Sequence, residues 1–192
     1  MEAVYRQARG LLEGASHATG KDEKVSKIML LVEVCVHRAD GPLVQEMVGG
    51  VCGFATDRSS ATRRAVLDFC ERVVAGSESE ADGGCASVAL ETAAFLSLDA
   101  AEAVAVRALR VVAVVLERAR AGVDVADVSR ERICGSVDGA RRVESTGGEA
   151  ASGAYVAAAC EALLALLLRD CRRRPICGTR DDVTKQKEGD LT

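Results

Sequence analysis

This 192-residue chain contains eight cysteines, the residue type here with the widest range of possible reactions, because thiols form disulfides, bind zinc and act as nucleophiles. No pair of them has the C-x₂-C spacing of a zinc knuckle, and only His17 and His37 could supply further ligands. The first ten residues lack the apolar segment of a signal peptide, so we expect a reducing compartment and free thiols. The cysteines are Cys35, Cys52, Cys70, Cys85, Cys134, Cys160, Cys171 and Cys177.

The surroundings of individual cysteines predict different exposures. Cys35, Cys70 and Cys160 lie in apolar stripes with helical spacing, where a free thiol behaves as a small core residue. Cys171 and Cys177 lie in a polar C-terminal stretch, and we expect them to be exposed and oxidisable.

The other residue types give no sign of catalysis. His17 lies beside a predicted turn and His37 near a predicted helix end, which favours surface positions. Paired glycines begin at positions 49, 83 and 147, but no Lys-Ser/Thr follows them and no strand precedes them, so no phosphate-binding loop is predicted. The expectation is a protein that is not an enzyme and that needs no metal or cofactor.

Two aspartates open polar breaks and lie close to basic residues. Asp57 could pair with Arg63 or Arg64, and Asp99 with Arg107, either as functional ion pairs or as structural ones. We favour a structural role in repeat turns, because an Asp before a helix can cap its first amides and pair with basic neighbours.

Composition favours packed helices and a protein partner. Aromatic residues make up 3% of the chain, so Ala, Val and Leu must form the core, and only Pro42 and Pro175 could interrupt helices. The net charge of −4 argues against direct binding to DNA, and few aromatics remain for stacking on bases. The apolar run at 154–168 is shorter than a membrane span needs and contains Glu161, so no membrane binding is expected.

Apolar residues recur with helical spacing over most of the chain. Pro42 suits the first turn of one helix, and Ser59 or Ser60 and Gly76 suit the start and the end of the next. We predict that each helix follows its neighbour antiparallel. The predicted helices are 2–16, 21–39, 42–55, 59–76, 85–97, 100–121 and 150–173, with a further short helix within 123–137.

Two aromatic residues and three glycines carry specific packing predictions. Phe69 and Phe95 lie on apolar stripes and are expected in the core. Glycines at 49, 50 and 53 weaken the helix 42–55, and either they let a neighbouring helix approach closely or the helix is locally frayed.

A sequence pattern repeats along the chain. Phe54 and Phe95, whose positions differ by 41 residues, each end an apolar stretch, and each is followed by an Asp and then by a helix with basic residues. A helix-pair period near 40 residues indicates a HEAT-type α-solenoid, in which each pair buries its apolar face against its neighbours. We expect an all-α domain at 1–173 with pairs at 1–39, 41–76, 84–121 and 123–173, a loop insertion near 138–150, and a disordered tail at 174–192.

Residues 26–74 resemble the N-terminal domain of the symplekin family, and residues 85–119 fit the next repeat of that family more loosely, so the resemblance covers roughly residues 1–120. The resemblance rests on a Ser-Lys-Ile helix opening, an Asp-Pro-Leu-like turn, a Phe-x-x-Asp ending, a Ser cap and a helix with Arg followed by an apolar-Phe-Glu pattern. The matching positions are Ser26, Lys27, Ile28, Asp40, Pro42, Leu43, Phe54, Asp57, Ser59, Arg63 or Arg64, Phe69 and Glu71. Gly41 departs from the pattern by separating Asp40 from Pro42.

The resemblance implies a non-enzymatic HEAT-repeat scaffold in mRNA cleavage and polyadenylation, located in the nucleus. Its partners would be 3′-end processing factors and a phosphatase that acts on the C-terminal domain of RNA polymerase II. The family domain is longer than this sequence, so either a fragment or a short relative is expected. The alternative is a cytoplasmic HEAT-repeat adaptor in phosphatase assembly or vesicle traffic.

A HEAT array would present the second helix of each pair on its concave side. Exposed basic residues there are the candidates for partner binding, because a cationic cluster on an acidic chain could steer an acidic partner. The alternative is that they only solvate the helices or pair with Asp57. The candidates are Lys24, Lys27, Arg63, Arg64 and Arg72.

Overall fold

The computed structural model describes residues 1–37, 39–76, 83–118, 131–135 and 153–173, and within these ranges the regular elements are helices joined by turns, with no strand. Residues 131–135 form a short helix. The other helices are α1 (Glu2–His17), α2 (Lys21–His37), α3 (Gly41–Cys52), the 3₁₀ helix η1 (Gly53–Thr56), α4 (Ser60–Gly76), α5 (Gly83–Leu96), α6 (Glu102–Arg118) and α8 (Gly153–Arg173).

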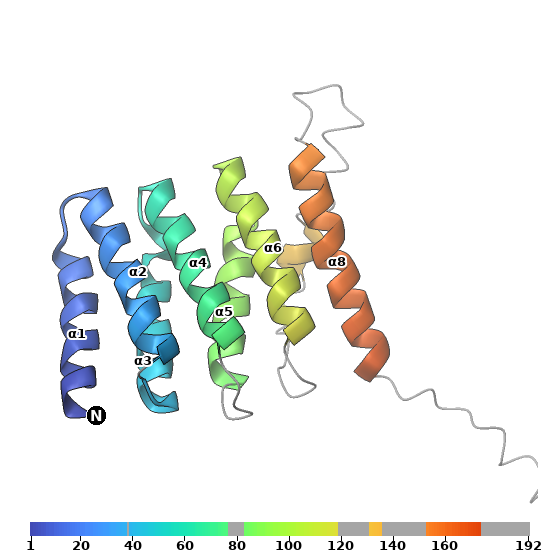
Figure 1. The fold of residues 1–192 in the computed structure, drawn as a ribbon. Coiled ribbons are helices and arrows are strands. Elements are labelled where there is room, and N and C mark those ends of the chain that lie inside the picture. Colours follow the sequence, from blue (N-terminus) through green and yellow to red (C-terminus); the bar gives the residue numbers. More distant parts are fainter. Residues whose placement is uncertain (38, 77–82, 119–130, 136–152, 174–192) are drawn as a thin grey trace, which may run out of the picture.

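The helices pack antiparallel in two layers (Figure 1). Helices α2, α4, α6 and α8 lie side by side in front, and each contacts the next. Behind them, α3 contacts α1 on one side and α5 on the other. Each front helix thus contacts its neighbours in its own layer, and α4 also contacts α3 and α5 behind it.

The predicted helix positions are confirmed, with small changes at the ends. The predicted helix 42–55 is divided, because the α-helical bonding stops at Cys52 and a 3₁₀ turn begins at Gly53. Glycine is a poor helix former, so this position is a natural end for α3. Residues 119–121 and 150–152 of two predicted helices, the predicted insertion near 138–150 and the predicted tail at 174–192 lie outside the described residues.

Side-chain caps explain where two of the helices begin. The Asp40 carboxylate accepts a hydrogen bond from the Leu43 N–H at 3.1 Å, and Pro42 occupies the first turn of α3. The Ser59 hydroxyl accepts a long bond, 3.4 Å, from the Thr62 N–H at the start of α4. These caps satisfy first-turn amides that have no partner within the helix.

One continuous core runs between the two layers and consists mainly of Ala, Val and Leu. Phe69 on α4 is fully buried, as predicted. Phe95 is not in the core: its residue is 42% exposed, and the Arg132 guanidinium lies 5.4 Å from the ring centroid. The apolar neighbours Ala93, Ala94 and Leu96 are buried instead. The buried stripe of α5 therefore includes the residues on either side of Phe95 but not Phe95 itself.

Cys35 and Cys70 are buried, as their stripes predicted, and burial raises the pKa of the Cys35 thiol to about 12. Cys160 contradicts the prediction because it is exposed on α8. The side chain of Cys171 and all of Cys177 lie outside the described residues.

The three glycines of the α3 region differ in their surroundings. A Cβ atom at Gly50 would overlap the Leu12 side chain of α1. A Cβ atom at Gly49 or Gly53 would have no neighbouring atom within 4 Å. Gly50 therefore permits the close approach of α1 to α3 that the sequence suggested, and the other two do not serve that purpose.

Candidate protein-interaction surface

The first of two similar turns is organised by Asp57, which follows η1. One carboxylate oxygen of Asp57 accepts a bond from the Ser59 N–H at 2.8 Å, and the other accepts one from the Lys24 ammonium at 2.7 Å. The Lys24 ammonium also lies 5.5 Å from the centroid of the Phe54 ring. Lys24 belongs to α2, so this turn before α4 is tied to the preceding front helix.

The second turn, before α6, repeats this geometry around Asp99. Its carboxylate accepts a bond from the Ala101 N–H at 2.8 Å and two bonds from the Arg63 guanidinium at 2.6 and 2.8 Å. Arg63 lies on α4 and also donates to the Asp57 carbonyl at 2.7 Å. Its side chain therefore bridges two successive turns.

The electrostatics of the two turns are alike. Burial raises the pKa of both Asp57 and Asp99, but hydrogen bonds from Lys24 or Arg63 and from a backbone N–H outweigh it, so both pKa values lie below their usual range. Both aspartates are therefore charged at neutral pH. Hydrogen bonds in which the donor or the acceptor is charged are stronger than those between neutral groups.

One pairing expected from sequence is confirmed, because Lys24 pairs with Asp57, as the alternative to partner binding expected. The other expected pairings were wrong. Neither Arg63 nor Arg64 pairs with the Asp57 carboxylate, and Arg107 does not pair with Asp99. Arg107 on α6 instead bonds two acidic residues of α4, Asp68 at 2.7 Å and Glu71. Sequence proximity suggested pairs within one repeat, whereas the side chains reach between neighbouring front helices.

The five candidate residues for partner binding differ in availability. Lys24 and Arg63 have side chains only 17% and 15% exposed and are bonded to the turn aspartates, so they are poor contact residues. The Lys27 ammonium bonds Glu23 at 2.6 Å and the Gly14 carbonyl at 3.1 Å. Arg72 is exposed and lies 3.7 Å from Glu33 of α2. Arg64 is exposed on α4.

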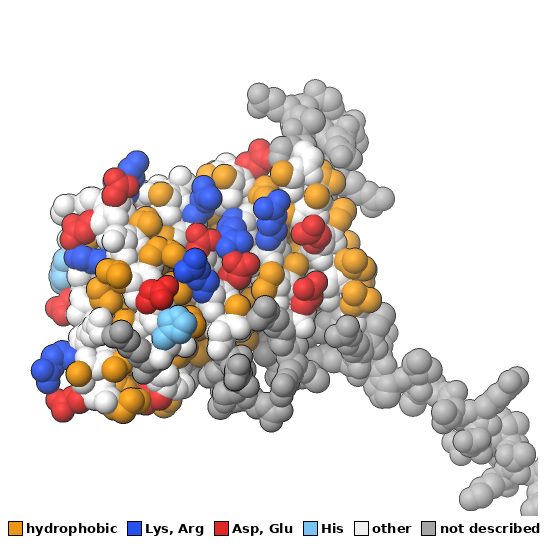
Figure 2. Space-filling model, viewed as in Figure 1, with side chains coloured by type: hydrophobic (Ala, Val, Ile, Leu, Met, Phe, Trp, Pro, Cys, Tyr) orange, Lys and Arg blue, Asp and Glu red, His pale blue; other side chains and the backbone are white. Residues whose placement is uncertain are grey.

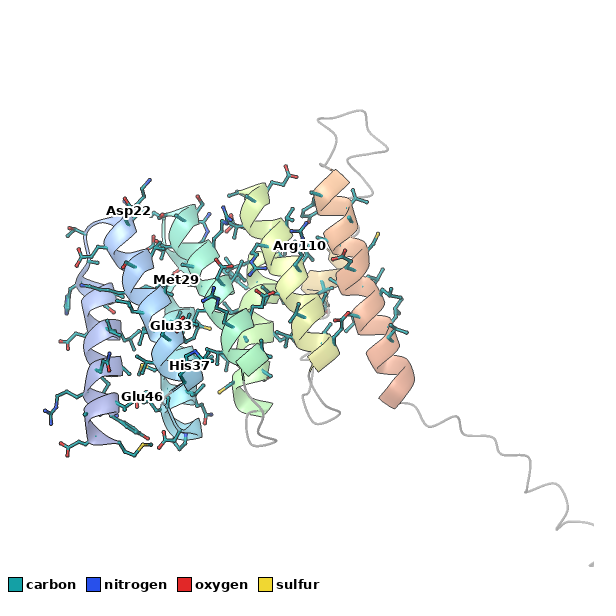
Figure 3. The ribbon with its side chains drawn as sticks, in the orientation of Figure 1. Asp22, Met29, Glu33, His37, Glu46 and Arg110 are labelled. Atoms are coloured by element: carbon teal, nitrogen blue, oxygen red, sulfur yellow. The ribbon has the colours of Figure 1, made fainter. Side chains whose placement is uncertain are left out.

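The front face carries both signs of charge rather than a cationic cluster. Figure 2 shows basic and acidic side chains interleaved over α4 and α6. Figure 3 shows Glu33 and His37 on α2 and Arg110 on α6, and Arg110 is exposed. The contact residues expected from sequence did not include Glu33 or Arg110, although the spacing of both on the polar side of their helices could have identified them.

Helix α8 adds an apolar part to this surface. Leu164, Leu167 and Leu168 recur at helical spacing and are 56%, 52% and 50% exposed. Hydrophobic side chains gather along α8 at the right of the described part in Figure 2. Exposed apolar stripes of this kind are typical of surfaces that contact another protein element. At the opposite end, the exposed side chains of α1 include Glu2, Arg6 and Arg9.

Within the described ranges, no three His, Cys, Asp or Glu side chains lie close enough together to hold a metal ion. His17 and His37 are both exposed. None of the helices in these ranges has the length and the apolar content needed to cross a membrane.

Comparison of the chain with protein-family profiles, curated proteins and solved structures gave no match.

Proposed function

We propose that this chain is a HEAT-type helical-repeat scaffold that binds proteins and catalyses no reaction. The observation that carries the proposal is the repetition of one turn geometry. Asp57 and Asp99 each bond a backbone N–H two residues ahead and a basic side chain of the preceding front helix. Successive helix pairs joined in the same way are expected of a one-dimensional array, in which each repeat is stabilised by its neighbours.

The front face of α2, α4, α6 and α8 is the proposed contact surface. Arg64, Arg72 and Arg110 are exposed there, and Glu33 and Glu161 lie among them. Interleaved charges give specificity and orient a partner, and the leucines of α8 provide apolar area to bury. Because rows of helices hold these groups at fixed spacing, little conformational entropy of this chain would be lost when a partner binds.

The more specific proposal concerns the partner. The resemblance of residues 26–74 to symplekin supports a nuclear role in mRNA cleavage and polyadenylation, with docking of an RNA polymerase II C-terminal-domain phosphatase. Of the matched positions, Lys27 lies on α2 of the front face, and Phe69 is a buried core residue of α4. A cytoplasmic adaptor of phosphatase or vesicle-trafficking assemblies is the alternative.

Affinity capture from cells of the source organism distinguishes these two roles. The full chain and an Arg64→Glu/Arg110→Glu variant would be used as baits, with Arg6→Glu/Arg9→Glu on α1 as the charge-matched control. The proposal expects 3′-end processing factors with the wild type and the control, and their loss with the first variant. Recovery of coat or kinase assemblies instead would support the adaptor, and equal recovery with all three baits would contradict the proposed surface.

A further inference from the structure

Two thiols from different helices meet inside the α3–α4–α5 junction. The Cys52 Sγ, at the last residue of α3, lies 3.7 Å from the Cys70 Sγ in the middle of α4, close enough for one thiol to donate to the other. Disulfide sulfurs are about 2.05 Å apart, so bond formation needs an approach of less than about 2 Å. Rotation of the two side chains with a small shift of the end of α3 would provide it.

The backbone around Cys52 is suited to such a shift. Gly49, Gly50 and Gly53 surround this position, and the α-helix gives way to a 3₁₀ turn directly after it. Glycine restricts the backbone least, and at Gly49 and Gly53 no neighbouring atom lies where a side chain would begin. This end of α3 can therefore adjust at lower cost than the middle of α4, where Cys70 is fully buried.

The two thiols also differ in ways that suit successive roles. Cys52 is half-buried, whereas Cys70 has no exposed surface. A hydrogen bond with Cys70 lowers the pKa of Cys52 despite its burial, and a bond with Thr92 of α5 lowers it further. The bond with Cys52, together with burial, raises the pKa of Cys70. Cys52 is accordingly the thiol that forms a thiolate and meets a small oxidant first.

We propose that Cys52 and Cys70 are a redox modification site that closes into an intramolecular disulfide when the protein meets a peroxide. The Cys52 thiolate attacks one peroxide oxygen, the O–O bond breaks, and the other oxygen takes up a proton and leaves as water. The Cys70 sulfur then attacks the resulting Cys52 sulfenic acid, the S–O bond breaks, and the Cys70 proton leaves with the hydroxide as a second water. Two thiols and one hydrogen peroxide thus give one disulfide and two waters, and a dithiol reverses the change.

The test uses the folded, reduced full chain and hydrogen peroxide at a stoichiometric amount. Remaining thiols are blocked with N-ethylmaleimide before unfolding, and the protein is digested with trypsin without reduction. Cleavage at Arg58 and Arg64 places the two cysteines on separate peptides, 39–58 and 65–72. The proposal expects these peptides joined, with the mass of their sum less two hydrogens, and separated again by dithiothreitol.

Variants assign the two roles. Cys52→Ser abolishes the joined peptide, whereas Cys85→Ser, a control at another buried cysteine, leaves it unchanged. Cys70→Ala is expected to trap Cys52 as a sulfenic acid that dimedone labels. The proposal is overturned if the wild type, with its helical circular dichroism intact, shows no joined peptide or shows it only after unfolding, because the thiols would then be packing residues alone.

Discussion

Arg63 of α4 donates two hydrogen bonds to the carboxylate of Asp99, 36 residues later in the chain, and it also donates to the carbonyls of Asp57 and Arg58 in the turn before its own helix. One guanidinium thereby fixes the α4 turn relative to the α6 turn. The Asp99 side chain is 7% exposed, so it depends on this partner for most of its solvation. Coupling between repeats thus resides in individual polar side chains as well as in the apolar core.

Removal of that guanidinium should destabilise the whole array. Arg63→Ala is expected to lower the free energy of unfolding by about 2–4 kcal/mol, because it leaves the Asp99 carboxylate largely buried without its partner. Arg64→Ala, at the exposed next position, should change it by less than about 0.5 kcal/mol. Urea unfolding followed by circular dichroism measures both. Equal effects at the two positions would show that the bridge between turns contributes nothing.

The turn aspartates should also make stability depend on acid pH. Their pKa values are lower in the folded protein than in the unfolded chain. Their contribution to the free energy of unfolding is therefore fully present above the pKa of an unfolded-chain Asp, about 4. It is lost as pH falls through the lower folded value. Asp99→Asn should therefore be less stable than the wild type at neutral pH, and the difference should shrink below about pH 4. A difference that stays constant down to about pH 2 would contradict the charge-based account.

The two phenylalanines provide a contrast within the core. Phe69→Ala should lower stability by about 3–5 kcal/mol, because the ring is fully buried and its removal leaves a cavity. Phe95→Ala should cost about 1 kcal/mol or less, since much of that ring already contacts water and Arg132. Thermal or urea unfolding of the two variants provides the comparison. A larger loss at Phe95 would mean that the register of α5 is incorrect.

Neighbouring glycines of α3 make a matched pair of substitutions. Gly49→Ala should raise stability by about 0.5–1 kcal/mol, because alanine favours the helix and its methyl group meets no atom. Gly50→Ala gains the same propensity but forces Leu12 of α1 to move. We expect it to be at least about 1 kcal/mol less stable than Gly49→Ala in the same unfolding measurement. Equal stabilities would show that α1 does not approach α3 closely.

The sequence predicted the helices well because their apolar spacing is strong and their ends carry recognisable residues. Ser59 and Asp40 lie where helices α4 and α3 begin, and Pro42 occupies the first turn that suits it. The end of α3 was placed too late because Phe54 and Ala55 continue the apolar pattern through a 3₁₀ turn. Apolar spacing alone does not distinguish the two kinds of helix.

The surface was predicted less well, because ion pairs between repeats depend on how neighbouring helices align. Arg63 was expected to pair with Asp57, six residues earlier, yet its carboxylate partner Asp99 lies 36 residues away, and Lys24 reaches Asp57 over 33 residues. Phe95 and Cys160 show the same limit for apolar residues: both continue a stripe, and both are exposed. On helices that are apolar nearly all round, periodicity does not reveal which side faces the core.

Direct binding to the purified polymerase C-terminal-domain phosphatase tests the proposed scaffold role most sharply. Binding would be measured at low and at near-physiological salt for the wild type, Arg64→Glu/Arg110→Glu and the α1 control Arg6→Glu/Arg9→Glu, after circular dichroism has shown that all three are folded. We expect the wild type and the control to bind, and the front-face variant to bind roughly tenfold more weakly at low salt with a reduced salt dependence. No binding by the wild type would contradict the phosphatase-docking role, and equal affinity for all three proteins would contradict the front face as the contact surface.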